Sequence, residues 1–274
     1  RFAAKEAMFK AISESLEDKY DLCWKNYEVL CDKNGKPHIN ILGINIDNIE
    51  VTGTSSVGGL IGQIYNNNTI KEVAIYGKVT GTSDGIGGLI GYIGNAASDI
   101  SGVLVNVNVT GNTNTGGLIG SVGTVNITNS YSRGDVSGHS NTGGLIGKVT
   151  SGGTITESYA SGNVNGYSQT GGFIGYTASV TITKSYASGN VSGYSYTGGF
   201  IGESSANIDK CYASGNVNGN SNVGGFIGYK RGGTINNIYA LGNVSASSNY
   251  AGLIGLNYNN TTNGYTIGKV TPLT

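Results

Sequence analysis

The 274-residue chain has 16 basic and 16 acidic side chains, so its formal net charge is zero, and charged residues make up only 12 % of it. Such a chain lacks the positive surface that nucleic acids and anionic membranes attract. Glycine is abundant, at 48 residues, without the every-third-residue period of collagen. No apolar run approaches the ~18 residues that span a bilayer. We therefore expect no nucleic-acid partner and no membrane span.

The first segment, residues 1–37, differs in composition from the rest of the chain. Residues 3–19 contain neither Gly nor Pro and are rich in Ala, Glu and Lys, which predicts an amphipathic helix. A stacked repeat fold needs a cover over its apolar cross-section and its unpaired strands. We therefore predict that residues 1–37 form an N-terminal helical cap. The alternatives are a piece of an upstream domain and an element of assembly.

The chain has three cysteines, and their spacing excludes a Cys-x-x-Cys metal or redox motif. Cys23 and Cys31 either pair in a disulfide or remain two buried free thiols. Cys211 falls in a column of small residues that otherwise holds serine in the preceding repeats. We interpret Cys211 as an interior filler and not as a nucleophile.

From residue 38 to residue 274, one turn sequence recurs at a nearly fixed interval. The Thr-Gly-Gly-Leu-Ile-Gly of residues 142–147 is one of eight copies, separated by steps of 29, 29, 27, 28, 27, 26 and 27 residues. Such a period is the signature of stacked repeats. Each repeat holds three short β-branched or aromatic runs, which predict three short strands. The prediction for residues 38–274 is an all-β, right-handed parallel β-helix of about eight coils with three short strands per coil.

When the repeats are aligned on the glycine pair, identical polar and aromatic residues fall into columns. Asparagine and tyrosine columns are typical of structural ladders, in which the same side chain stacks from coil to coil. Asp135 replaces asparagine in one repeat, and we interpret it as an isosteric replacement and not as a catalytic carboxylate. The predicted ladder comprises Asn163, Asn190, Asn216 and Asn243 in one column and Tyr159, Tyr186 and Tyr212 in the other.

A second group of columns offers candidates for a ligand or adhesion surface. A threonine precedes the glycine pair in the middle repeats, with another hydroxyl residue two positions earlier; a flat hydroxyl grid of this kind could order water or bind ice. Tyrosines lie just before these positions, and exposed aromatic rows are platforms for sugars or proteins. The alternatives are ordinary strand threonines and tyrosines that cover apolar backbone. The candidate residues are Tyr167, Tyr194, Tyr196, Thr142, Thr170 and Thr197.

Signals of an enzyme are weak throughout the sequence. The two histidines, His38 and His139, lie about four repeats apart. The sequence has no His-Glu-x-x-His motif, no nucleophile elbow and no phosphate-binding loop of the Gly-x-x-x-x-Gly-Lys type. We therefore expect no catalytic residue, no cofactor and no metal site, and we predict that the protein is not an enzyme.

The repeat sequence resembles the GLUG-motif family over about residues 40–256. A clear copy is the Tyr-Ala-Ser-Gly-Asn-Val of residues 159–164 followed by the Gly-Gly-Phe-Ile-Gly of residues 171–175. The resemblance implies a large bacterial or archaeal cell-surface protein, a group that includes adhesin-like proteins and the repeat region of some immunoglobulin A-cleaving metallopeptidases. It does not imply protease activity, because the metal-binding motif of those enzymes is absent.

The leading hypothesis is an extracellular, cell-surface β-solenoid that acts as a structural or adhesive module. Its partner would be a protein or glycan on a host or neighbouring cell. The alternative is a filament or sheath subunit that stacks head-to-tail on copies of itself through the ends of the solenoid. An ice-binding protein and a polysaccharide-active enzyme are weaker hypotheses.

Overall fold

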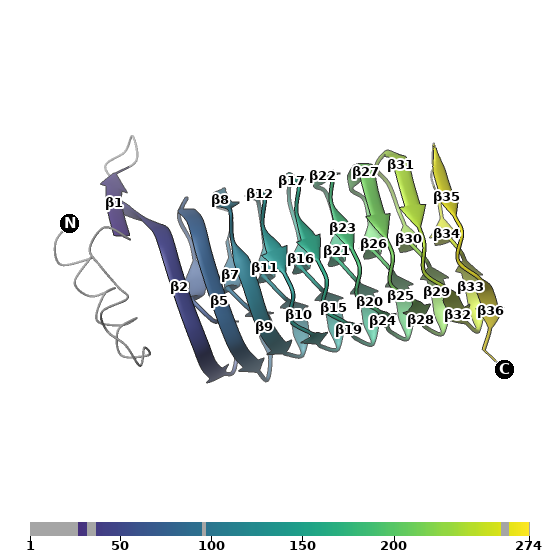
Figure 1. Cartoon of the computed structure of the whole chain (residues 1–274), viewed down its shortest axis with the longest axis horizontal. Helices are drawn as coiled ribbons and strands as arrows, with labels where there is room; N and C mark the ends of the chain where they lie inside the picture. Colours follow the sequence, from purple (N-terminus) through teal and green to yellow (C-terminus); the bar gives the residue numbers. More distant parts are fainter. Residues whose placement is uncertain (1–26, 32–36, 95–96, 259–262, 274) are drawn as a thin grey trace.

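The computed structural model describes residues 27–31, 37–94, 97–258 and 263–273. In these residues every regular element is a β-strand, and the strands stack coil upon coil along one axis (Figure 1). Strands pair in parallel with their equivalents in the neighbouring coils, as in the register of Thr142 with Thr115 below and Thr170 above. The predicted all-β parallel solenoid of about eight coils is therefore confirmed, while its right-handedness stays a prediction.

The strands form three sheets that run the length of the solenoid. Sheet B contains β3 (Val57–Gly58), β6 (Asp84–Gly87), β10 (Thr113–Gly116), β15 (Ser140–Gly143), β20 (Ser168–Gly171), β25 (Ser195–Gly198), β29 (Ser221–Gly224) and β33 (Ser248–Ala251). Sheet C contains β4 (Ile61–Ile64), β7 (Ile90–Ile93), β11 (Ile119–Val122), β16 (Ile146–Val149), β21 (Ile174–Thr177), β26 (Ile201–Ser204), β30 (Ile227–Lys230) and β34 (Ile254–Asn257).

Sheet A is the largest and takes up the remainder of each coil. It contains β1 (Tyr27–Cys31), β2 (Pro37–Gly53), β5 (Thr69–Gly81), β8 (Ser98–Ser101), β9 (Leu104–Thr110), β12 (Val125–Thr128), β13 (Tyr131–Ser132), β14 (Val136–Ser137), β17 (Gly153–Thr156), β18 (Tyr159–Ala160), β19 (Val164–Asn165), β22 (Thr181–Thr183), β23 (Tyr186–Ala187), β24 (Val191–Ser192), β27 (Asn207–Ala213), β28 (Val217–Asn218), β31 (Ile235–Ala240), β32 (Val244–Ala246), β35 (Gly264–Thr266) and β36 (Val270–Pro272).

The number of strands per coil equals the predicted three in the coils β2 to β4 and β5 to β7 and exceeds it in the later coils, up to β34. A middle coil has five, β15 to β19, because its sheet A portion is divided into three short segments. Glu157 lies at one division with φ of 52°, and Lys184 has φ of 50° at the same point of the next coil. In these coils the strand is interrupted at the left-handed residue, whereas Lys210, with φ of 56°, lies inside the continuous strand β27.

The N-terminal segment is described only in part. β1 pairs antiparallel with β2, with Tyr27 opposite Ile41, and thereby adds a strand to the edge of the first coil. Residues 3–19 and Cys23 lie outside the described residues. The helical cap and a disulfide between Cys23 and Cys31 therefore stay predictions.

The core is a continuous apolar column inside the coils. Isoleucines at the start of the sheet C strands, such as Ile146, are fully buried and in register. Phe173, Phe200 and Phe226 are also fully buried and stack with ring centroids 4.6 and 4.8 Å apart. Burial of one such side chain stabilises the fold by about 1.5–3 kcal/mol, so the repeated apolar positions hold each coil on its neighbours.

Sheets B and C approach each other through glycine. A Cβ atom on Gly143 would collide with the carbonyl oxygen of Ile146, and one on Gly147 would lie 2.6 Å from the amide nitrogen of Thr115. Only glycine permits a backbone approach this close. The recurring glycines therefore bring the sheet B and sheet C side chains of adjacent coils together on one face of the solenoid.

Candidate ligand-binding face

An aromatic strip precedes the strands of sheet B. It consists of His139, Tyr167 and Tyr194, whose ring centroids are 4.9 Å apart at each step and whose planes differ by only 13° and 1°. The amide of Tyr167 donates to the His139 carbonyl and that of Tyr194 to the Tyr167 carbonyl, which keeps the rings in register. Tyr167 and Tyr194 are each 47 % exposed. The rings therefore form a flat stack that is open to solvent.

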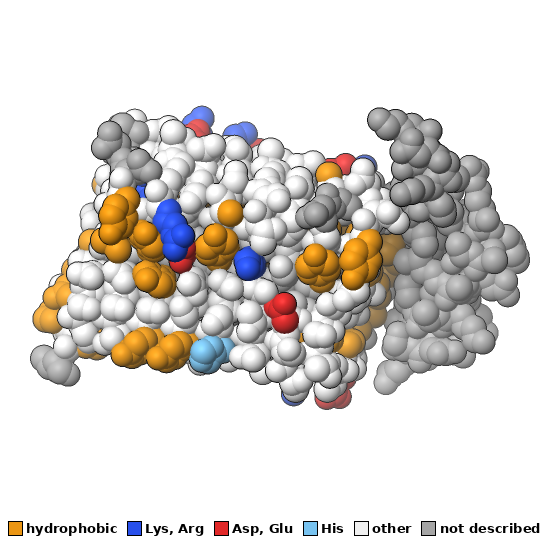
Figure 2. Space-filling model, turned by 180° about the vertical axis from the view of Figure 1, so that it is seen from behind, with side chains coloured by type: hydrophobic (Ala, Val, Ile, Leu, Met, Phe, Trp, Pro, Cys, Tyr) orange, Lys and Arg blue, Asp and Glu red, His pale blue; other side chains and the backbone are white. Residues whose placement is uncertain are grey.

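Rows of aromatic or apolar side chains are visible on the face of the solenoid that Figure 2 shows. Figure 2 shows a histidine beside a short row of apolar or aromatic side chains, and a second row in which single charged side chains lie between aromatic or apolar ones. Tyr167 and Tyr194 were predicted to belong to a ligand surface, whereas His139 was not. The signal was present, because His139 occupies the same position of its repeat as the two tyrosines.

The threonine candidates are corrected by the structure. Thr142, Thr170 and Thr197 are fully buried, so they cannot contribute to a ligand or ice-binding surface. The preceding residue in each coil has a left-handed backbone, as at Asn141 with φ of 49° and Gln169 with φ of 46°. This residue breaks the alternation of a strand, and the threonine turns inward instead of sharing a face with the serine two positions earlier.

Tyr196 lies apart from the aromatic strip. It occupies the left-handed position, with φ of 51°. Its ring packs against that of Tyr229 with centroids 5.3 Å apart, and it is partly buried. Tyr196 therefore belongs to the space between sheets B and C, where residues of β25 and β30 meet.

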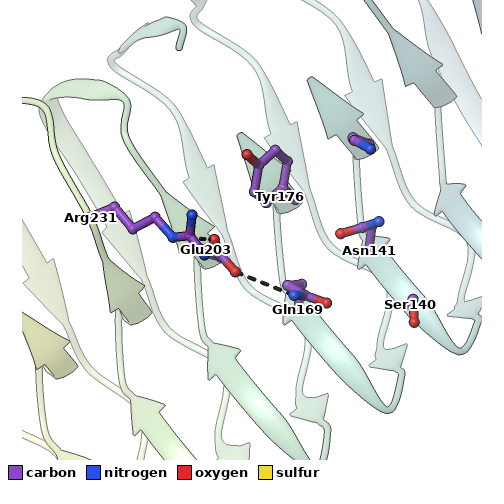
Figure 3. A pocket seen from close by; sticks show the side chains of 7 residues that line it. Ser140, Asn141, Gln169, Tyr176, Glu203 and Arg231 are labelled. Atoms are coloured by element: carbon purple, nitrogen blue, oxygen red, sulfur yellow. Dashed lines mark hydrogen bonds and ion pairs between the residues drawn. The ribbon is translucent and has the colours of Figure 1, made fainter. Parts of the chain in front are cut away.

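A polar groove lies between sheets B and C, in the coils of β15 to β30 (Figure 3). Its open volume is about 370 Å³, and its lining residues are Ser140, Asn141, Lys148, Gln169, Tyr176, Glu203 and Arg231. Arg231 Nε lies 2.6 Å from Glu203 Oε1. Gln169 Nε2 donates to Glu203 Oε2 over 3.3 Å.

The charges in this groove are held in place by neighbouring side chains. The side chain of Glu203 is only 2 % exposed. Arg231 Cζ lies 5.2 Å from the centroid of the Tyr229 ring, and Lys148 Nζ lies 5.7 Å from that of Tyr176. None of these groove residues follows from the repeat pattern. Lys148 and Glu203 are isolated charges within one column of sheet C, and periodicity gives no signal for isolated residues.

The family model described as the GLUG motif matches residues 138–165 and 193–218. The chain contains GLUG repeats. Residues 138–165 begin just before His139 and end after Val164, so they include part of the aromatic strip and of the groove.

The other comparisons add little to the family assignment. A holo-[acyl-carrier-protein] synthase from Chlorobium limicola is 39 % identical over 49 residues, which are 18 % of this chain and 37 % of that protein. The GLUG-repeat chain thus spans little more than a third of that relative's length. No solved structure matches the chain significantly.

The asparagine ladder of the GLUG repeats links side chains to backbone. The side-chain oxygen of each ladder residue accepts from the amide nitrogen of the equivalent residue one coil on: Asn163 to Asn190 at 3.1 Å, Asn190 to Asn216 at 3.0 Å and Asn216 to Asn243 at 3.0 Å. Asp135 performs the same role, because its Oδ1 accepts from the amide of Asn163 over 2.7 Å. This geometry makes Asp135 part of the ladder.

The tyrosine ladder of sheet A stacks ring on ring. Centroids lie 4.8 Å apart between Tyr159 and Tyr186 and between Tyr186 and Tyr212. Burial, reinforced by the neighbouring tyrosines, raises the pKa of Tyr186 and of Tyr212. These rings are more enclosed than those of the aromatic strip and offer less surface to a ligand.

Cys211 is a buried free cysteine in the described part of the chain. Burial raises the pKa of the Cys211 thiol to about 12, so this cysteine is no nucleophile at neutral pH. Among the described residues, no cluster of His, Cys, Asp and Glu has the arrangement of a metal site. The described residues also contain no helix long and apolar enough to cross a membrane.

Proposed function

We propose that this GLUG-repeat protein is an extracellular, cell-surface solenoid module that combines a structural role with adhesion. The observation that carries the proposal is the aromatic strip of His139, Tyr167 and Tyr194, which is flat, in register and exposed. An ordinary solvated surface has no need of stacked exposed rings, whereas rings of this kind bind the apolar faces of sugars and of protein side chains. The partner is a glycan or protein on a host or neighbouring cell.

The mechanism we propose is presentation on a stiff support. The strip lies on backbone that is fixed by interstrand hydrogen bonds on both sides, so its side chains lose little conformational freedom when they bind. Individual contacts are weak. Repetition of the module along a surface raises the effective concentration of the second and later contacts, and avidity follows.

A binding screen tests the proposal. The full chain is applied to arrays of glycans and extracellular matrix proteins, together with the double variant Tyr167→Ser/Tyr194→Ser. We expect the chain to bind at least one class and the double variant to lose most of that binding. Tyr265→Ser is the matched control, since Tyr265 is 57 % exposed but lies in sheet A. Equal binding by the double variant and the chain would overturn the assignment of the strip.

A second candidate function is head-to-tail assembly with copies of the same chain. The last described coil exposes apolar side chains, with Ile267 71 %, Val270 41 % and Leu273 43 % exposed. A second copy stacked on β35 and β36 would cover them and pair the open strand edge. Electron microscopy over a concentration series tests this candidate: uniform fibres that lengthen with concentration support it, and dispersed particles at every concentration exclude it.

The two weaker hypotheses fare differently. Ice binding loses its structural basis because the threonines of the proposed grid are buried. The prediction that the protein is not an enzyme stays a proposal, and an assay for release of reducing sugar from polysaccharides would contradict it by showing turnover.

A further inference from the structure

The groove between sheets B and C lies where the repeat pattern is broken. One column of sheet C runs through it in register from strand to strand, and only two of its eight members are charged, Lys148 and Glu203. The column consists of Gln63, Tyr92, Ser121, Lys148, Tyr176, Glu203, Tyr229 and Leu256. The other six members are uncharged, and the column, unlike the tyrosine ladder of sheet A, does not repeat one residue type. The two charges are therefore local additions to the solenoid.

Two energetically unfavourable choices meet at this point. The carboxylate of Glu203 is almost fully buried, and burial of a charge is costly unless partners compensate it. Gln169, which donates to that carboxylate, has a left-handed backbone at a position where four other coils use asparagine, the residue that tolerates it better. Tyr196 has the same left-handed conformation one coil on, so the buried carboxylate of Glu203 is the feature that distinguishes this point of the solenoid.

The chemistry of the groove defines the class of ligand. The negative charge of Glu203 is compensated by Arg231, 2.6 Å away. The additional charge of Lys148 gives the groove a net charge of one positive unit. The ring of Tyr176 lies between Lys148 and Glu203 in the column and gives the groove an aromatic wall. The amides of Asn141 and Gln169 and the hydroxyl of Ser140 supply donors and acceptors for hydroxyl groups. A pocket of about 370 Å³ is at the small end of ligand sites.

We propose that this groove binds an anionic saccharide, a pyranose ring that carries a carboxylate or a sulfate. The ring lies against Tyr176, the anion faces the ammonium of Lys148, and the hydroxyls meet the amides of Asn141 and Gln169. The inference rests on the proposed adhesive function, for which it names the ligand class. The groove is separate from the aromatic strip, although Ser140 follows His139 directly and the two sites share one face.

Calorimetric titration of the full chain tests the inference. The probes are an oligogalacturonide, a sulfated galactose oligomer and the neutral galactose oligomer of the same length. We expect at least one of the two anionic probes to bind, more weakly as salt rises, and the neutral probe to bind at least about tenfold more weakly. The anionic probe that binds more tightly shows whether the groove prefers a carboxylate or a sulfate. Failure of both, or equal binding of the neutral probe, would overturn the inference.

Variants locate the binding in the groove. Lys148→Ser places in this column the residue that Ser121 already supplies one coil earlier, so the fold should survive, and thermal unfolding checks this. We expect it to weaken binding of the anionic probe at least about tenfold. Lys71→Ser is the matched control, because it removes the same charge from an exposed position of sheet A. Unchanged binding by Lys148→Ser would contradict the groove as the site.

The outcomes separate this inference from the proposed function. Tyr167→Ser/Tyr194→Ser should leave binding of the soluble anionic sugar within about twofold, because the strip lies outside the groove. Adhesion that needs the strip, without any binding of anionic sugar, would overturn the inference and leave the adhesive function standing. Binding of the anionic sugar in the groove, without adhesion to any array, would overturn the adhesive function and leave the inference standing.

Discussion

In one column of sheet B, four threonine hydroxyls lie inside the solenoid without a hydrogen-bond partner in the described part of the chain. They belong to Thr115, Thr142, Thr170 and Thr197, all fully buried. A buried hydroxyl without a partner costs about 1–3 kcal/mol. The chain itself replaces this residue in the next coil, where Val223 pairs in register with Thr197.

Replacement of one such threonine should therefore stabilise the protein. We predict that Thr170→Val raises the free energy of unfolding by about 1 kcal/mol, measured by denaturant unfolding. Ser158→Ala is the control, because Ser158 Oγ donates to the Thr156 carbonyl over 2.9 Å, and its loss should lower the free energy of unfolding by about 1 kcal/mol. A destabilised Thr170→Val protein would mean that the hydroxyl has a partner.

Because the thiol of Cys211 is buried, the free energy of unfolding should depend on pH, with a sign that follows from its raised pKa. Its pKa is about 12 in the folded protein, because burial opposes the thiolate, and about 8.5 in an unfolded chain. The unfolded state therefore loses its proton first. The stability contributed by the protonated thiol is complete below about pH 8.5 and is lost progressively as pH rises toward 12.

Two measurements check this prediction in a Cys23→Ser/Cys31→Ser background. A thiol reagent at pH 8 should label Cys211 only when the protein unfolds. The free energy of unfolding should fall more steeply between pH 9 and pH 11 than that of the same protein with Cys211→Ser, in which no thiol ionises. Rapid labelling of the folded protein at pH 8 would contradict the burial of this cysteine.

At the scale of elements, the asparagine ladder predicts a difference between two substitutions of one residue. Asn190→Ala removes the oxygen that accepts from the amide of Asn216 and should lower the free energy of unfolding by about 0.5–1 kcal/mol. Asn190→Asp should be nearly neutral, since Asp135 fills the same role in its own coil. Denaturant unfolding of both variants tests the ladder, and equal losses would show that the side-chain oxygen does not matter.

Stacking and register could be predicted from the sequence, whereas side-chain direction at sheet B could not. The glycine pairs and the isoleucine that follows them fix which residues of successive coils pair, and the structure has that register. The sequence does not reveal the left-handed backbone at Asn141 and Gln169, because asparagine and glutamine are also ordinary loop residues. The threonines after them were therefore assigned to the wrong face.

The groove could not be predicted for a different reason. Lys148, Glu203 and Arg231 come from different coils and meet only because parallel stacking places β16, β26 and the end of β30 within a few strand spacings of one another. Repeats make columns of identical residues visible in the sequence, but a site built from isolated charged residues of different coils becomes visible only in three dimensions. The aromatic strip, in contrast, repeats a similar residue at one position and was partly recognised.

At the scale of the whole molecule, the solenoid separates stability from function. The apolar interior and the ladders of sheet A are repeated in nearly every coil, so each coil is held by its neighbours. The unusual residues gather on the side formed by sheets B and C. Eight coils at the strand spacing give a rod roughly 35 Å long, which is stiff enough to hold this side toward a partner.

The claim that the side formed by sheets B and C binds the partner is best tested by hydrogen exchange, measured with and without the ligand found by the array screen. We expect binding to slow amide exchange at the aromatic strip and its adjoining strands β15, β20 and β25, and to leave exchange in the tyrosine ladder of sheet A unchanged. Protection confined to sheet A, or to the terminal strands β35 and β36, would contradict the claim that the side formed by sheets B and C is the binding face.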